Sequence, residues 1–129
     1  MHRMESAGGV YRATIEGLRL QAAAFPVQRE ALPDFVHLPD EILSAVDAAF
    51  VAQLIGNGEV SAESIAALRQ HETYIDTCEP IEDYTEALAA VESGSWFEGL
   101  RAQARKALMA LDEDCTPPNL DGTTYVPGT

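Results

Sequence analysis

Cationic side chains are scarce in this sequence. Its 129 residues include 8 Lys and Arg against 21 Asp and Glu, a formal net charge of -13. Proteins that bind nucleic acids or anionic membrane surfaces draw much of their affinity from Lys and Arg. The shortage therefore argues against a nucleic acid or a membrane as the partner, whereas the same charge would attract a basic protein at low salt.

Cysteines and long apolar runs are also scarce. Cys78 and Cys115 lack the C-x-x-C spacing of zinc and redox sites, so we expect two free thiols, with a single disulfide between them as the alternative. No stretch approaches the ~20 apolar residues of a membrane span. Residues 1–10 carry charges at Arg3 and Glu5 and lack the apolar core of a signal peptide. These features predict a cytoplasmic protein.

The hydrophobic pattern favours helices. Alternation with period two is not sustained anywhere, whereas apolar residues recur at helical spacing. The pattern predicts an all-α fold, a compact bundle of four to five helices with an extended loop around residues 32–38, where two prolines disfavour helix. We expect a single helical domain over residues 10–111, a flexible N-terminus over residues 1–9 and a poorly ordered tail over residues 112–129.

Helix boundaries follow from capping residues. The first helix is expected from Tyr11 to Phe25, with Pro26 opening a kinked extension or a separate turn. A second, continuous helix should start at Pro39 and end at Gly56-Asn57-Gly58. Side-chain caps then predict two further helices, one after Ser61 and one after Asp83.

The last predicted helix starts at Ser95. Ser95-Trp96-Phe97-Glu98 has the S-x-x-E form of a capping box, and the apolar residues that follow share one helix face. Arg101 falls on the opposite face together with Arg105 and Lys106. In the loop around residues 32–38, the apolar residues Phe35, Val36 and Leu38 should close one end of the core.

His71 is the most distinctive titratable residue. It falls in the apolar arc of its helix, where a half-buried histidine can titrate near neutral pH. Glu72 and Asp76 lie one turn apart on the same helix, so together with His71, or with His37 from the loop, they could outline a metal or acid-base site. Asp47, at the border of an apolar stripe, is the remaining candidate binding residue. The alternative is a core histidine beside solvated carboxylates.

Signature motifs of catalysis are absent from the sequence. It contains no H-E-x-x-H, no two-Cys two-His pattern, no calcium loop, no P-loop, no G-x-G-x-x-G and no G-x-S-x-G. We therefore predict no metal, no cofactor and no catalytic residue with a defined role.

One segment carries a resemblance. The sequence from Leu32 to Glu41, Leu-Pro-Asp-Phe-Val-His-Leu-Pro-Asp-Glu, has the form L-P-x-F-V-x-x-P-D-E. It resembles a group of small acidic bacterial helical proteins with no assigned activity, and the similarity runs from about Leu32 to Leu111. In that group an acidic pair follows the motif, whereas here Asp47 is followed by Ala48. The resemblance implies a helical fold and a cytosolic setting.

Three functional hypotheses fit these features. The first is a non-enzymatic protein-binding module, such as an immunity protein or an antitoxin-like inhibitor of a basic partner. The second is a metal-dependent or carboxylate- and histidine-dependent enzyme or regulator that uses His71. The third is a homodimeric helical scaffold or a small-ligand sensor, in which a spare apolar face meets a second copy or a ligand.

Overall fold

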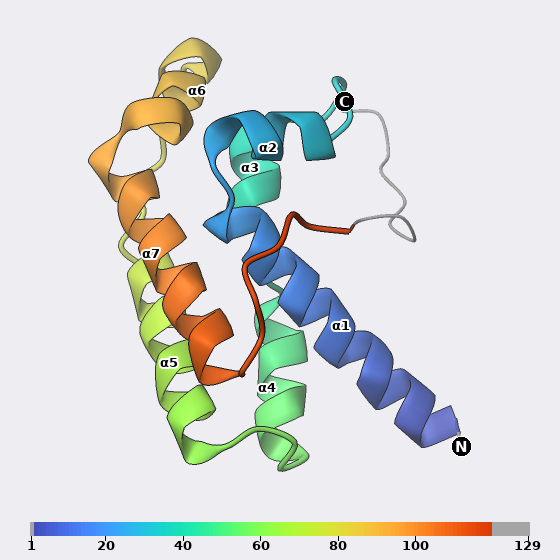
Figure 1. Cartoon of the computed structure of the whole chain (residues 1–129). Coiled ribbons are helices and arrows are strands. Elements are labelled where there is room, and N and C mark those ends of the chain that lie inside the picture. Colours follow the sequence, from blue (N-terminus) through green and yellow to red (C-terminus); the bar gives the residue numbers. More distant parts are fainter. Residues whose placement is uncertain (1, 120–129) are drawn as a thin grey trace.

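The computed structural model describes residues 2–119, and the side chains of residues 8–119, and within this range all regular structure is helical. The all-α prediction is confirmed, although the described range holds seven helices instead of four to five. Figure 1 shows their arrangement, and the bounds are α1 His2–Ala22, α2 Phe25–Ala31, α3 Leu38–Leu43, α4 Ala48–Gly56, α5 Ala62–Ile75, α6 Tyr84–Ser93 and α7 Ser95–Ala110.

The first helix is longer than the apolar pattern suggested. α1 begins at His2 instead of Tyr11, so residues 2–9, which we expected to precede the domain, belong to a helix. Pro26 lies in the first turn of α2, where a proline fits because its missing N–H would have no helical partner. Pro26 therefore starts a separate helix and does not kink α1.

The helix predicted from Pro39 to Gly56 is two helices. α3 ends at Leu43, and α4 starts at Ala48 with Asp47 as its N-cap. The Asp47 carboxylate accepts a hydrogen bond of 2.8 Å from the Ala49 amide. Both helices bury apolar residues, so the apolar stripe continues across the break, and this continuity made the pair look like one helix.

α7 is the central helix of the fold. It packs against α1, α5 and α6, while α4 packs on α1 and α3 packs on α6. Two apolar clusters share α1 and α7: one lies between α1, α4, α5 and α7, and the other joins α1, residues 32–36, α3, α6 and α7. Ala104 and Ala107 of α7 are fully buried, and their small side chains let α7 approach its neighbours closely.

Two local predictions for this region are wrong. Ser95 is the first residue of α7 instead of its cap, and the N-cap, Gly94, makes no side-chain cap bond. The Tyr74 hydroxyl ties this helix start to α5, because it donates a 2.7 Å hydrogen bond to the Trp96 carbonyl. Arg101, expected on the exposed face, is only 4% exposed.

The proline-containing loop is irregular over residues 32–37. It holds a turn in which the Val36 amide donates to the Pro33 carbonyl, so it is not extended throughout. Val36 and Leu38 are buried and close the core as expected, whereas Phe35 is 48% exposed.

Residues 112–119, part of the predicted tail, contact α1. Arg19 forms ion pairs with Glu113 at 3.3 Å and Asp114 at 2.8 Å, and the Tyr11 hydroxyl donates to Glu113. Residues 120–129 of the predicted tail lie outside the described residues. No helix within residues 2–119 has the length and the apolar character that a membrane crossing requires.

Candidate functional site

His71 lies in the core, more deeply than expected. It is 3% exposed, and its Nε2 lies 2.6 Å from Oε1 of Gln21 on α1. Gln21 donates its own amide N–H to the Ile42 carbonyl, so its Oε1 faces the imidazole as an acceptor. This arrangement favours the neutral histidine with a proton on Nε2. Burial lowers the pKa of His71 from 6.5 to about 4.

The predicted carboxylate partners lie elsewhere. Glu72 and Asp76 are exposed, and Asp47 is exposed at the start of α4, where it caps the helix. Among the residues that the structure describes, no group of three or more His, Cys, Asp and Glu side chains could hold a metal ion. The structure thus places His71 beside Gln21 in the packed interior, and this geometry supports the core-histidine interpretation.

Burial of a neutral histidine makes stability depend on pH. The unfolded chain protonates His71 near pH 6.5 and the folded protein only near pH 4, so the unfolded state binds more protons between these values. We expect lowering the pH from 7 to 5 to cost about 2 kcal/mol of unfolding free energy through this residue. His71→Gln, which can still donate to Gln21, should remove this part of the pH dependence. Urea unfolding of both proteins at the two pH values measures it, and an unchanged pH slope in the variant would contradict the assignment.

A second polar cluster, missed at the sequence level, surrounds Arg101. Its guanidinium donates to the Ala23 carbonyl at 3.1 Å, to Gln28 Oε1 at 3.2 Å and to the Val91 carbonyl. Glu98 pairs with it at 2.7 Å from the surface side. These acceptors belong to the end of α1, to α2, to α6 and to α7 itself, so the cluster ties these helices together.

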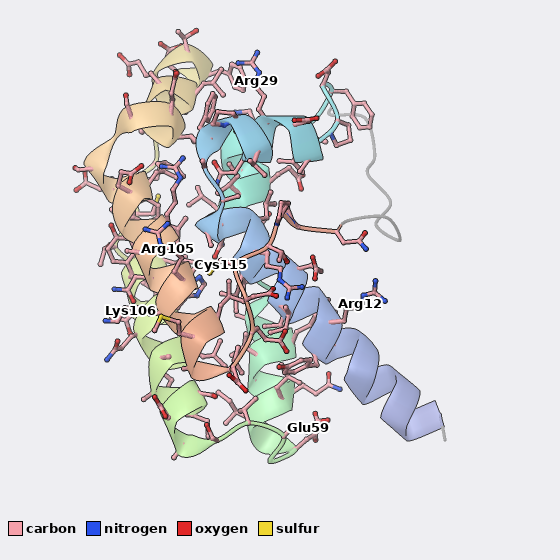
Figure 2. All side chains as sticks on the ribbon, viewed as in Figure 1. Arg12, Arg29, Glu59, Arg105, Lys106 and Cys115 are labelled. Carbon is pink, nitrogen blue, oxygen red and sulfur yellow. The ribbon has the colours of Figure 1, made fainter. Side chains whose placement is uncertain are left out.

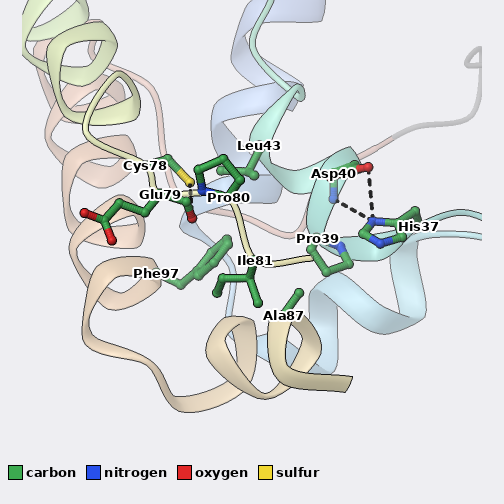
Figure 3. Close-up of a pocket in the computed structure, with 10 residues that line it drawn as sticks. All are labelled: His37, Pro39, Asp40, Leu43, Cys78, Glu79, Pro80, Ile81, Ala87 and Phe97. Carbon is green, nitrogen blue, oxygen red and sulfur yellow. Dashed lines mark hydrogen bonds and ion pairs between the residues drawn. The ribbon is translucent and has the colours of Figure 1, made fainter. Parts of the chain in front are cut away.

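A cleft on another face has the features of a binding site. It encloses about 310 Å³ between α3, residues 78–81, α6 and the start of α7. Figure 3 shows apolar side chains in its middle and the carboxylates of Asp40 and Glu79 toward its edges. The lining residues are His37, Pro39, Asp40, Leu43, Cys78, Glu79, Pro80, Ile81, Ala87 and Phe97.

Local structure positions the polar side chains of this cleft. His37 is the N-cap of α3, and its Nδ1 accepts the Asp40 amide N–H at 3.3 Å. The same nitrogen lies 3.2 Å from Asp40 Oδ2, so the imidazole and this carboxylate are neighbours at one edge of the cleft. On the opposite wall, residues 78–81 form a loop after the end of α5 at Ile75, and Pro80 in this loop disfavours helix.

The acidic side chains of the cleft belong to a part of the chain in which carboxylates far outnumber cations. Residues 30–100 contain 15 Asp and Glu but a single cationic side chain, Arg69. Figure 2 labels cations that lie elsewhere, on α1, α2 and α7. Two further cations, Arg19 and Arg101, already form ion pairs with carboxylates of this chain. Two carboxylates, Asp40 and Glu79, line the cleft and no Lys or Arg does, so we expect its local potential to be negative.

The two cysteines differ in their surroundings, and both are free thiols. Cys78 is half-buried on the cleft wall, and burial together with the charge of Glu79 raises the pKa of its thiol, whereas Cys115 is exposed. At neutral pH we expect iodoacetamide to alkylate Cys78 about tenfold more slowly than Cys115. Mass spectrometry of Cys115→Ser and Cys78→Ser over time measures the two rates. In urea the rates should converge, and equal rates in the folded state would contradict this difference.

Comparisons of the chain with models of protein families, with curated proteins and with solved structures find no match.

Proposed function

We propose that this protein is a non-enzymatic binding module for a basic protein in the cytoplasm, acting as an immunity protein or an antitoxin-like inhibitor does. The observation that carries the proposal is the segregation of charge, with 15 carboxylates and one cation over residues 30–100. A surface of one sign concentrates an oppositely charged partner and speeds the encounter.

The interior supports the same function. His71, the residue on which the enzyme hypothesis depended, bonds to Gln21 and is 3% exposed, and desolvation keeps it neutral at pH 7. A general base must reach the proton that it abstracts from a substrate. A histidine enclosed in this way is better suited to stabilising the core than to acting on a substrate.

Capture at two ionic strengths tests the proposal. The immobilised full chain is incubated with extract of its own cells at about 0.05 M and about 0.5 M salt, which shortens the electrostatic screening length severalfold. We expect a protein rich in Lys and Arg to bind at low salt and to elute at high salt. The purified partner should then bind the purified chain at equimolar ratio by calorimetry.

The control is a variant with the same fold and a changed surface charge. Glu72→Gln, Asp76→Asn, Glu82→Gln and Glu86→Gln alter four exposed carboxylates within the acidic region, none of which acts as an N-cap. This variant should bind the partner more weakly, mainly through a slower association rate. A partner without excess positive charge, or equal affinity at both salt concentrations, contradicts the proposal.

A further inference from the structure

One exposed apolar side chain lines the cleft, and another contacts a residue of its wall. Of the four large apolar residues that are well exposed in the described range, Ile81 lines the cleft, and Tyr84 packs its ring on His37 at 4.9 Å between centroids. Phe35 precedes His37 by two residues, and only Met109 belongs to another region. Clustered exposed apolar side chains of this kind are typical of surfaces that bind other proteins.

The floor of the cleft is apolar and its edges are acidic. Ala87 and Phe97 are each 5% exposed at the bottom, while Asp40 and Glu79 are exposed at the edges. No Lys or Arg lines this cleft. A second cleft, by Phe25, differs in this respect because Arg101 and Arg105 line it together with Glu92 and Glu98, so its charges are balanced.

The size and charge of the cleft specify the occupant. A volume of about 310 Å³ lies at the lower end of the range for ligand pockets, which is about 300–1,000 Å³. It can hold one or two large side chains but no folded domain. A second copy of this chain is disfavoured, because a two-fold interface would place two acidic rims against each other.

We propose that the cleft holds a large apolar side chain from a partner segment whose flanking Lys or Arg side chains pair with Asp40 and Glu79. The proposal rests on the proposed function, since it names the anchoring site for a basic partner. Ile81 contributes apolar contact at the rim, and Phe97 forms the base against which the anchor packs. The acidic edges reject segments with Asp or Glu next to the anchor, which gives specificity as well as affinity.

Two labelled peptides test the anchor. One carries a central Leu-Trp pair with lysines on both sides, and the matched peptide has Ala-Ala at its centre. Fluorescence anisotropy with the full chain at low salt should show roughly tenfold tighter binding of the Leu-Trp peptide, the gain expected from burying one large side chain. Both peptides should weaken at high salt.

Variants locate the binding site. Ile81→Ser should reduce the advantage of the Leu-Trp peptide to about twofold or less, since it removes most of one apolar contact surface. Met109→Ser, the same kind of change at a residue that is 77% exposed on α7, should leave the advantage intact. Asp40→Asn with Glu79→Gln should weaken both peptides more than Glu59→Gln with Glu63→Gln. Glu59 lies at the connection between α4 and α5, at the end of the molecule opposite to α6 (Figure 2).

A chemical footprint gives an independent measurement. In the Cys115→Ser background, the Leu-Trp peptide should slow the alkylation of Cys78, because Cys78 lines the cleft. Equal affinity of the two peptides, equal behaviour of Ile81→Ser and Met109→Ser, or an unprotected Cys78 overturns the anchor, as does the absence of binding by either peptide. If both peptides bind in a salt-sensitive way but show none of these differences, the proposed function is retained and charge alone supports it. Its failure is detected separately, by the capture experiment.

Discussion

Arg101→Met is expected to lower the free energy of unfolding by about 4 kcal/mol, because it leaves buried acceptors without a donor. The guanidinium is 4% exposed and bonds to the carbonyls of Ala23 and Val91 and to Gln28 Oε1. Methionine keeps an unbranched apolar stem but has no donor, so the stem packing is largely retained while the hydrogen bonds are lost. Urea unfolding followed by circular dichroism measures the change.

Two variants control for charge and for position. Arg105→Met removes an exposed cation of the same helix whose one hydrogen bond, to the Ala22 carbonyl, is 3.4 Å long, and it should change stability by less than about 0.5 kcal/mol. Arg101→Lys keeps the charge but cannot present a planar fork to the three acceptors, so we expect an intermediate loss. Similar stabilities of Arg101→Met and Arg105→Met would rule out the role assigned to the buried cluster.

The need for Arg101 comes from the end of another helix. α1 stops at Ala22, and the last carbonyls of a helix have no partners within it. The Leu20 carbonyl accepts from Gln28 at 3.0 Å, the Ala23 carbonyl accepts from Arg101, and a cation near a helix C-terminus also interacts favourably with its dipole. The buried polar side chains thus satisfy a helix end that packing against α7 has removed from water.

Sequence patterns located helices far better than they located these partners. Hydrophobic spacing and the caps Ser61 and Asp83 placed the start of α5 and α6 correctly, since both signals depend on residues within a few positions of each other. Arg101 was placed on the exposed face because periodicity counts arginine as polar. The carbonyls that it bonds belong to Ala23, directly after α1, and to Val91 of α6, and only the folded chain brings them together.

The cleft was also hidden from the sequence. Its walls come from residues 37–43, from residues 78–81, from Ala87 and from Phe97, four segments with no common motif. A signal was nevertheless present at Ile81, an apolar residue in the acidic, proline-containing segment between two helices. The break before Asp47 could also be recognised in the sequence, because Asp47 precedes a run of apolar residues as an N-cap does.

Gly17→Ala is expected to lower the free energy of unfolding by about 3 kcal/mol, although alanine is the better helix former. Gly17 lies within α1 and is buried, and a Cβ there would lie 2.1 Å from the backbone oxygen of Ala45 and 2.9 Å from its carbonyl carbon. Backbone atoms cannot rotate away as a side chain can. The connection between α3 and α4 would have to move away from α1, which loosens the contacts of both helices with α1.

Gly9→Ala is the matched control on the same helix. No atom lies within 4 Å of a Cβ at Gly9, so only the helix propensity changes, and this variant should gain up to about 1 kcal/mol. The difference between the two variants isolates the contact with Ala45 from the preference of alanine for helix. Thermal and urea unfolding of both proteins measure that difference, and a Gly17→Ala protein as stable as Gly9→Ala would mean that α1 does not cross the α3–α4 connection at this distance. If Gly17→Ala loses the predicted stability, Gly17 is the residue that lets α1 lie against the connection between α3 and α4. This connection separates α3, which lines the cleft, from α4.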